Sequence, residues 1–190
     1  MPPKPKYTKE QIAAYAFDSV RRNGIGSLSA RTLAEGLGVS TAPLFTAFGS
    51  IEEIRREVEE RAYALYGEYI AEGLREPIPF KGAGLAYVRF AKDEPELFKL
   101  LFMSARSEEP SHFYPEGDIN APTVAGSAKD GYGLSEAQVK KLYNHLSVYV
   151  HGIATLYAQG RNVFTDGDVN DMLSEVFNAL LKEIKDEKRY

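Results

Sequence analysis

The stretch from residue 29 to residue 48, SARTLAEGLGVSTAPLFTAF, constrains the fold of this chain more than any other. Ser29 and Ser40 each precede a short apolar-periodic segment, as N-cap residues do, and Gly38 is typical of a residue that ends a helix. The apolar positions recur at helical spacing and predict a packing set made of Leu33, Ala34, Leu37, Val39, Leu44 and Phe48. We therefore expect two short helices joined by a tight turn. This is the pattern of a helix-turn-helix and also of an ordinary helical hairpin.

Helical spacing of apolar residues continues along the rest of the chain, and no segment alternates as a strand would. Residues 104–133 are rich in Gly, Pro, Ser and Asp, and we expect at least one short helix among them. The other expected helices run from the N-cap Thr8 to Asn23, from Ser50 toward Leu74, through Leu85 and Val88, through Leu97 to Phe102, over Ser135–Gln159 and over Asp166–Lys185. The sequence therefore predicts an all-α fold with two domains, residues 1–50 and residues 51–190.

Composition excludes several classes of protein. The chain has no cysteine, so it has no disulfide framework, zinc-thiolate site or catalytic thiol. No apolar run approaches the roughly 20 residues of a membrane span, and the lysine-containing start lacks the apolar core of a secretory signal, so we expect a cytoplasmic protein. The net charge is −4, but residues 1–50 hold six basic against three acidic groups. A basic N-terminal segment on an acidic body fits a DNA-binding domain, although so small an asymmetry also arises by chance.

Residues 8–53 resemble the N-terminal domain of the TetR/AcrR family of bacterial transcription regulators. The matching residues are Ile12-Ala13, Ala16-Phe17, Gly24, Ser29 to Ala34, Gly38-Val39-Ser40, Leu44-Phe45, Phe48 and Glu52-Glu53-Ile54. The resemblance implies a three-helix helix-turn-helix domain in which Ser40 caps the recognition helix. It places Thr41, Ala42 and Pro43 nearest the base edges, and Arg31 where it can reach a base or a phosphate. By the same resemblance, the residues along the phosphates would be Thr32, Phe45, Thr46 and Ser50, with Lys4, Lys6 and Lys9 adding non-specific attraction.

Three positions depart from the family pattern. Phe45 stands where the family usually has Tyr, Ala47 where it has His or Tyr, and Ile51 where it often has Lys. The recognition helix also lacks Arg, Lys, Asn and Gln, so base reading would depend on Arg31, on methyl contacts from Ala42 and Pro43, and on DNA shape. We therefore expect binding that is weaker or more narrowly specific than the family norm. The alternative is a helical interaction or ligand-binding dimer that has lost sequence-specific DNA binding.

The second domain is expected to pair two copies and to bind a small molecule. The last two helices carry wide apolar stripes, and the resemblance implies a homodimer in which they form a four-helix bundle. The resemblance also implies that an effector changes the tilt of the long helix after Ser50, most commonly relieving repression. An apolar or aromatic effector would contact some of the aromatic residues and the histidine of the middle helices, namely Tyr66, Tyr87, Phe90, Phe98, Phe102, Tyr143 and His151. Each of these side chains can equally be ordinary core.

Catalytic and cofactor motifs are not found in the sequence. The three histidines lie in no nucleophile motif, and neither GxSxG nor HExxH occurs. The run from Asp166 to Asp171 suggests a calcium loop but has Phe177 at the twelfth position, where a ligating Glu belongs. We therefore expect no enzyme activity, no metal and no cofactor.

Overall fold

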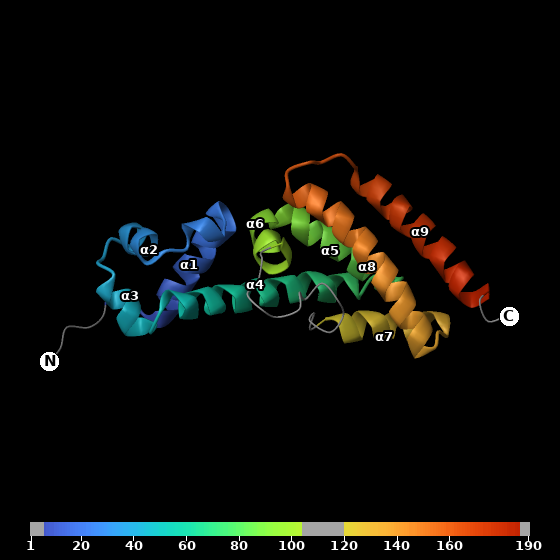
Figure 1. The fold of residues 1–190 in the computed structure, drawn as a ribbon, viewed down its shortest axis with the longest axis horizontal. Helices are drawn as coiled ribbons and strands as arrows, with labels where there is room; N and C mark the ends of the chain where they lie inside the picture. The colour runs from blue at the N-terminus through green and yellow to red at the C-terminus, as the bar shows by residue number, and fades with distance from the viewer. Residues whose placement is uncertain (1–5, 104–119, 187–190) are drawn as a thin grey trace. The chain divides into compact units, whose positions relative to one another are not determined.

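The computed structural model describes residues 6–103 and 120–186. All the regular elements among these residues are helices, with no strand (Figure 1), which confirms the expected all-α fold. Two compact units make up the chain. The first consists of Met1–Leu65 with Glu96–Ser104, and the second of Tyr66–Pro95 with Ala105–Tyr190. The division falls within one long helix. The expected division at residue 50 separates a DNA-binding part from an effector-binding and dimerisation part, and it stays a prediction.

Local capping defines the helices of the first unit. At the start of its first helix, Thr8 Oγ1 accepts a hydrogen bond from the Gln11 N–H while the Gln11 side chain accepts one from the Thr8 N–H, as the capping-box pattern predicts. An ion pair of 2.7 Å between Arg61 and Glu10 joins the long helix to the first one. The elements of this unit are α1 (Lys9–Asn23), the short 3₁₀ turn η1 (Ile25–Ser27), α2 (Ala30–Leu37), α3 (Ala42–Ala47), the first part of α4 (Ile51–Gly73), α6 (Pro95–Phe98) and the π-helical turn η2 (Lys99–Met103).

Helix α6 belongs to the first unit although it lies 30 residues beyond Leu65 in the chain. Gly24 ends α1 with a φ of 77°, and a Cβ atom built there would lie 2.4 Å from the Glu96 carboxylate. Glycine therefore suits this position because of its backbone conformation, whereas the Glu96 carboxylate is the end of a flexible side chain that could move aside. Apolar side chains of α6 and η2 complete the packing, since Leu97, Phe98, Leu100 and Leu101 are all buried.

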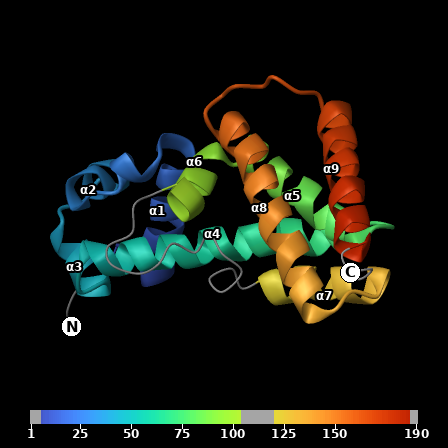
Figure 2. The same ribbon diagram turned by 45° about the vertical axis from the view of Figure 1, so that its right-hand side comes forward.

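The second unit is built around α5, which packs against the three following helices, as Figure 2 shows for α8 and α9. Its elements are α5 (Pro79–Asp93), α7 (Ala121–Tyr132), α8 (Glu136–Ala158) and α9 (Asp166–Asp186). The backbone at the start of α5 touches the end of α4, because a Cβ at Gly82 would lie 2.0 Å from the Gly73 carbonyl oxygen. Helix α7 confirms the short helix expected within residues 104–133, of which residues 104–119 lie outside the described ranges.

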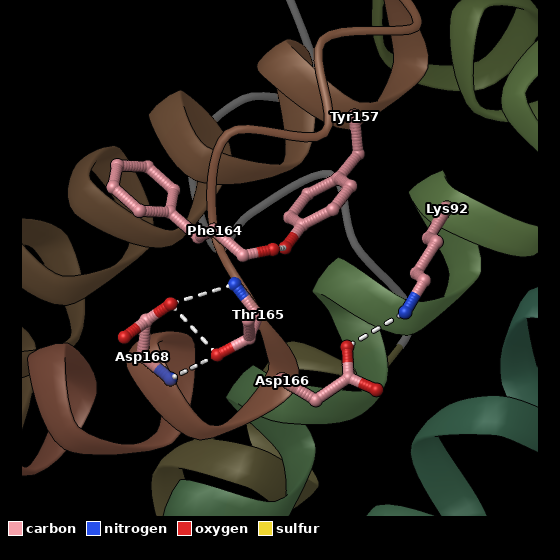
Figure 3. A network of polar contacts seen from close by, with 6 residues as sticks. All are labelled: Lys92, Tyr157, Phe164, Thr165, Asp166 and Asp168. Carbon is pink, nitrogen blue, oxygen red and sulfur yellow. Dashed lines mark hydrogen bonds and ion pairs between the residues drawn. The ribbon is translucent and has the colours of Figure 1, made fainter.

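A polar network fixes the connection between α8 and α9 (Figure 3). Tyr157 Oη donates a 2.6 Å hydrogen bond to the Phe164 carbonyl oxygen, and Lys92 of α5 pairs with Asp166 at 2.7 Å. Thr165 and Asp168 cap each other at the start of α9, and the hydrogen bonds from Thr165 lower the pKa of Asp168. These contacts show that the acidic run at 166–171 forms the start of a helix. Within the described ranges, no helix combines the length and apolar character of a bilayer span.

Candidate functional site

Helices α2 and α3 are joined by a tight turn at Gly38. Ser29 caps α2 as expected, with its Oγ accepting a 3.1 Å hydrogen bond from the Thr32 N–H. Gly38 has left-handed φ and ψ angles of 64° and 42°, which reverse the chain at low cost for a residue without Cβ. The inner face is anchored by Leu33, Leu44 and Phe48, which are at most 2% exposed. Burial of these side chains leaves the opposite face of both helices to solvent.

The structure corrects the expected cap of α3. Helix α3 begins at Ala42 with Thr41 in the cap position, and neither Ser40 nor Thr41 makes a side-chain capping bond. Pro43 accounts for part of this difference, because a cap at Ser40 would take its hydrogen bond from the N–H of residue 42 or 43, and proline has none, which leaves Ala42 as the single donor. The Leu44 N–H is already used by the Thr41 carbonyl oxygen. Ser40 is exposed and has no capping role here.

The outer face of α3 is apolar and hydroxylic. Thr41, Ala42, Phe45 and Thr46 are exposed, with 45% of Phe45 accessible, whereas Pro43 is half-buried. The Thr46 hydroxyl donates a 2.9 Å hydrogen bond back to the Ala42 carbonyl oxygen. This exposed face therefore offers shape and methyl groups more than hydrogen-bond donors.

Other predicted contact residues border this face and are held by local bonds. The Thr32 hydroxyl lies 2.6 Å from the Ser29 hydroxyl. Half-buried Ser50 accepts a hydrogen bond from the Glu53 N–H at the start of α4, where the Glu53 carboxylate accepts one from Gly49. Arg31 is exposed and pairs with Glu35, 2.9 Å away.

Two residues of the N-terminal arm contact the turn between α2 and α3. Lys6 Nζ donates a 3.1 Å hydrogen bond to the Gly38 carbonyl oxygen, and Tyr7 Oη donates one of 3.0 Å to the Leu37 carbonyl oxygen. The ammonium of Lys9 lies 4.7 Å from the centre of the Phe48 ring. Two of the three arm lysines therefore lie beside the helix pair, while Lys4 is outside the described residues. The contact of Tyr7 with Leu37 and the contact of Glu35 with Arg31 were not predicted from the sequence. The second contact could have been predicted, because Arg31 and Glu35 are four residues apart in one helix.

Four of the seven predicted effector residues come together in the second unit. The Tyr87 hydroxyl and His151 Nδ1 are joined by a 2.9 Å hydrogen bond between α5 and α8. The Tyr66 ring meets the Tyr87 ring edge to face at 5.9 Å and lies 5.4 Å from the Phe90 ring. Burial lowers the pKa of His151, which favours the neutral imidazole. The group combines apolar ring surface with one polar pair, as small-molecule sites do.

The remaining three predicted effector residues belong to other clusters. Phe98 and Phe102 stack on each other at 5.2 Å in the first unit, where Phe102 also meets Tyr63. Tyr143 packs against a core cluster of α7, α8 and α9 that includes Leu142. The sequence pattern could not separate these groups, because helical spacing gives the buried face of a helix but not its neighbour.

A surface pocket of about 320 Å³ lies between α5 and α9, and none of the predicted effector residues lines it. Its lining consists of Leu85, Val88, Arg89, Lys92, Asp93, Asp166, Val169 and Asn170. Lys92 forms an ion pair with Asp166 and Arg89 one with Glu72, and the Asp93 carboxylate accepts a hydrogen bond from the Tyr69 hydroxyl. Burial, together with Asp93 and Glu94, raises the pKa of Tyr69 to about 12, so this hydroxyl remains a donor. The pocket thus presents a largely neutralised rim.

The chain is all-helical in its described residues, with the short helix pair α2–α3 followed in the sequence by a larger helical unit. Residues 80–182 match the family model described as the Tetracyclin repressor-like C-terminal domain. The match covers more than half of the chain, and the chain belongs to the TetR family. It does not overlap residues 8–53, which carry the resemblance seen in the sequence, so two separate parts of the chain agree. No curated protein sequence matches the chain.

Proposed function

We propose that this protein is a ligand-responsive transcription regulator without enzyme activity that binds a palindromic DNA operator as a homodimer. The observation that carries the proposal is the helix pair α2–α3, which buries Leu33, Leu37 and Leu44 on one face. Its other face exposes Thr41, Ala42, Phe45 and Thr46. Membership of the TetR family supports the same role. Such a regulator would act in the cytoplasm, most simply as a repressor.

Helices α8 and α9 support the dimer in this proposal. Only Val169, Leu173 and Ile184 of the α9 stripe are buried. Its other apolar residues are half-buried, namely Met172, Val176, Phe177, Leu180 and Leu181. Val148 of α8 is 56% exposed. Apolar surface left over after a chain has packed its own core is what a second copy would cover.

The cluster of Tyr66, Tyr87, Phe90 and His151 supports an effector that is mostly apolar or aromatic. Tyr66 lies on α4, the same helix that begins at Ile51 shortly after α3. A ligand bound beside Tyr66 would therefore act on α4, whose first residues directly follow in sequence the residues proposed to contact DNA. Effector and DNA would then be linked by a coupling free energy, each weakening the binding of the other.

A second candidate function is a helical ligand-binding or interaction dimer that does not read DNA. The composition of α3 favours it, because Ala42–Ala47 contains no Lys, Arg, Asn or Gln and exposes Phe45. Selection of duplexes from a random DNA pool at low salt distinguishes the two functions. The regulator should enrich a palindrome, and the absence of any enriched sequence would favour the interaction dimer.

A further inference from the structure

Arg31 and Glu35 are the only charged residues between positions 29 and 48, and they bind one another. The guanidinium Nε lies 2.9 Å from Glu35 Oε1, one turn further along α2. The two side chains are 87% and 65% exposed, so the pair adds little to stability. Its significance depends on which nitrogen of the guanidinium the carboxylate engages.

The guanidinium of arginine carries five N–H donors in a fixed planar fork. Glu35 engages the single donor at Nε and leaves the four donors of the two terminal nitrogens. Those terminal donors are the ones that bind O6 and N7 of a guanine, two at a time, in the major groove. The pair seen in α2 is therefore compatible with base reading by the end of the Arg31 side chain.

We propose that Glu35 is a positioning residue that directs Arg31 toward a guanine edge. The inference rests on the proposed DNA-binding function. The carboxylate favours one orientation of a long, flexible side chain before DNA arrives, which lowers the ordering cost of binding. Its negative charge also disfavours a nearby phosphate, so the pair is less suited to the DNA backbone than to a base edge.

Arg31 and Glu35 are the charged part of a face whose other polar side chains are hydroxyls. The Thr46 hydroxyl is bonded to the Ala42 carbonyl oxygen, and the Thr32 hydroxyl to Ser29. Helix α3 contributes no side chain with a charged or amide donor. A guanine preference at one position of each half-site should therefore depend on Arg31 and, through it, on Glu35.

The experiment measures base preference with four variants. Pools selected by the wild type are compared with pools selected by Arg31→Ala, Glu35→Ala and Glu35→Gln, and the guanine-to-other-base ratio is read at every position. Glu59→Ala is the matched control, because Arg55 Nε and Glu59 Oε1 form the same i,i+4 pair, 3.0 Å apart, on α4. Thermal unfolding of each variant tests whether the fold is retained.

Arg31→Ala should reduce the guanine preference at one position by about five- to a hundredfold. Glu35→Ala should reduce it at that same position by about 1.5- to twofold and raise binding to unrelated DNA at low salt. Glu35→Gln, which keeps a hydrogen-bond acceptor, should retain part of the preference, and Glu59→Ala all of it. The inference is overturned if Glu35→Ala leaves the ratio unchanged, or changes it equally at all positions. A wild type that selects no sequence would instead overturn the proposed function and this inference with it.

Discussion

Gly82 has no room for a methyl group, whereas Gly84, two residues later on the same helix, has. A Cβ at Gly82 would lie 2.0 Å from a backbone oxygen of Gly73, but a Cβ at Gly84 would meet only Leu173 and Val150 at 3.7 Å. Gly82→Ala should therefore lower the free energy of unfolding by about 1–3 kcal/mol. Gly84→Ala, the control, should leave it unchanged or raise it by up to about 1 kcal/mol. Denaturant unfolding measures both, and equal effects would contradict the close contact between α4 and α5.

His151 should make stability depend on pH. Burial lowers the pKa of His151 from the usual 6.5, so the unfolded chain takes up this proton more readily than the folded one. The contribution to stability is present above pH 6.5 and is lost as the pH falls through the lower, folded-state pKa. The stability difference between wild type and His151→Gln should therefore narrow as the pH is lowered below 6.5. A pH-independent difference for His151→Gln would count against its burial as neutral imidazole.

Phe45 occupies an exposed position where the family usually has tyrosine. Since 45% of the side chain is accessible, a hydroxyl added there need not be buried. Phe45→Tyr should tighten binding to the selected operator by about two- to tenfold through a hydrogen bond to a phosphate. Fluorescence anisotropy measures the change, with thermal unfolding as the control for an unaltered fold. An affinity equal to that of the wild type would argue against a phosphate beside this residue.

At the scale of elements, caps and buried faces could be predicted because both depend on residues close in sequence. Thr8 with Gln11, and Ser135 with Gln138, form the predicted reciprocal caps. The predicted cap at Ser40 was wrong. Pro43 contributes to the difference because it removes one of the two N–H donors that such a cap would use, a condition that is itself readable from the sequence.

Neighbours distant in sequence could not be predicted. The Tyr87–His151 hydrogen bond joins residues 64 apart, and the Lys92–Asp166 pair joins residues 74 apart. Spacing along a helix identifies its buried side, but not the helix that covers that side. For this reason the effector residues were predicted as one set, although the structure places them in three clusters.

The exposed face of α8 offers a test of the proposed dimer. Val148 is 56% exposed on α8, and Val163 is 62% exposed in the connection before α9. Val148→Glu should shift the dimer toward monomer by at least about tenfold in dissociation constant, because a charge would be desolvated in the interface. Val163→Glu is the control and should not change association. Sedimentation equilibrium gives both constants, and equal effects of the two variants would show that α8 is not the interface.

At the scale of the whole molecule, the proposed function joins a helix pair that would contact DNA to an effector site through paired copies of the chain. Helix α4 runs from Ile51 to Gly73 without a break and contains residues of both units. The charge distribution fits the same division, with a positive N-terminal 50 residues on a chain of net charge −4.

The stoichiometry of the DNA complex tests this account most directly. Sedimentation velocity of the protein with the selected operator, and with a duplex carrying only half of it, counts the chains bound. The account predicts two chains on the full operator, with the two half-sites about 10 base pairs apart or a multiple of that, and much weaker binding to the half-site. A single chain on each duplex, with equal affinity for the operator and its half, would contradict it.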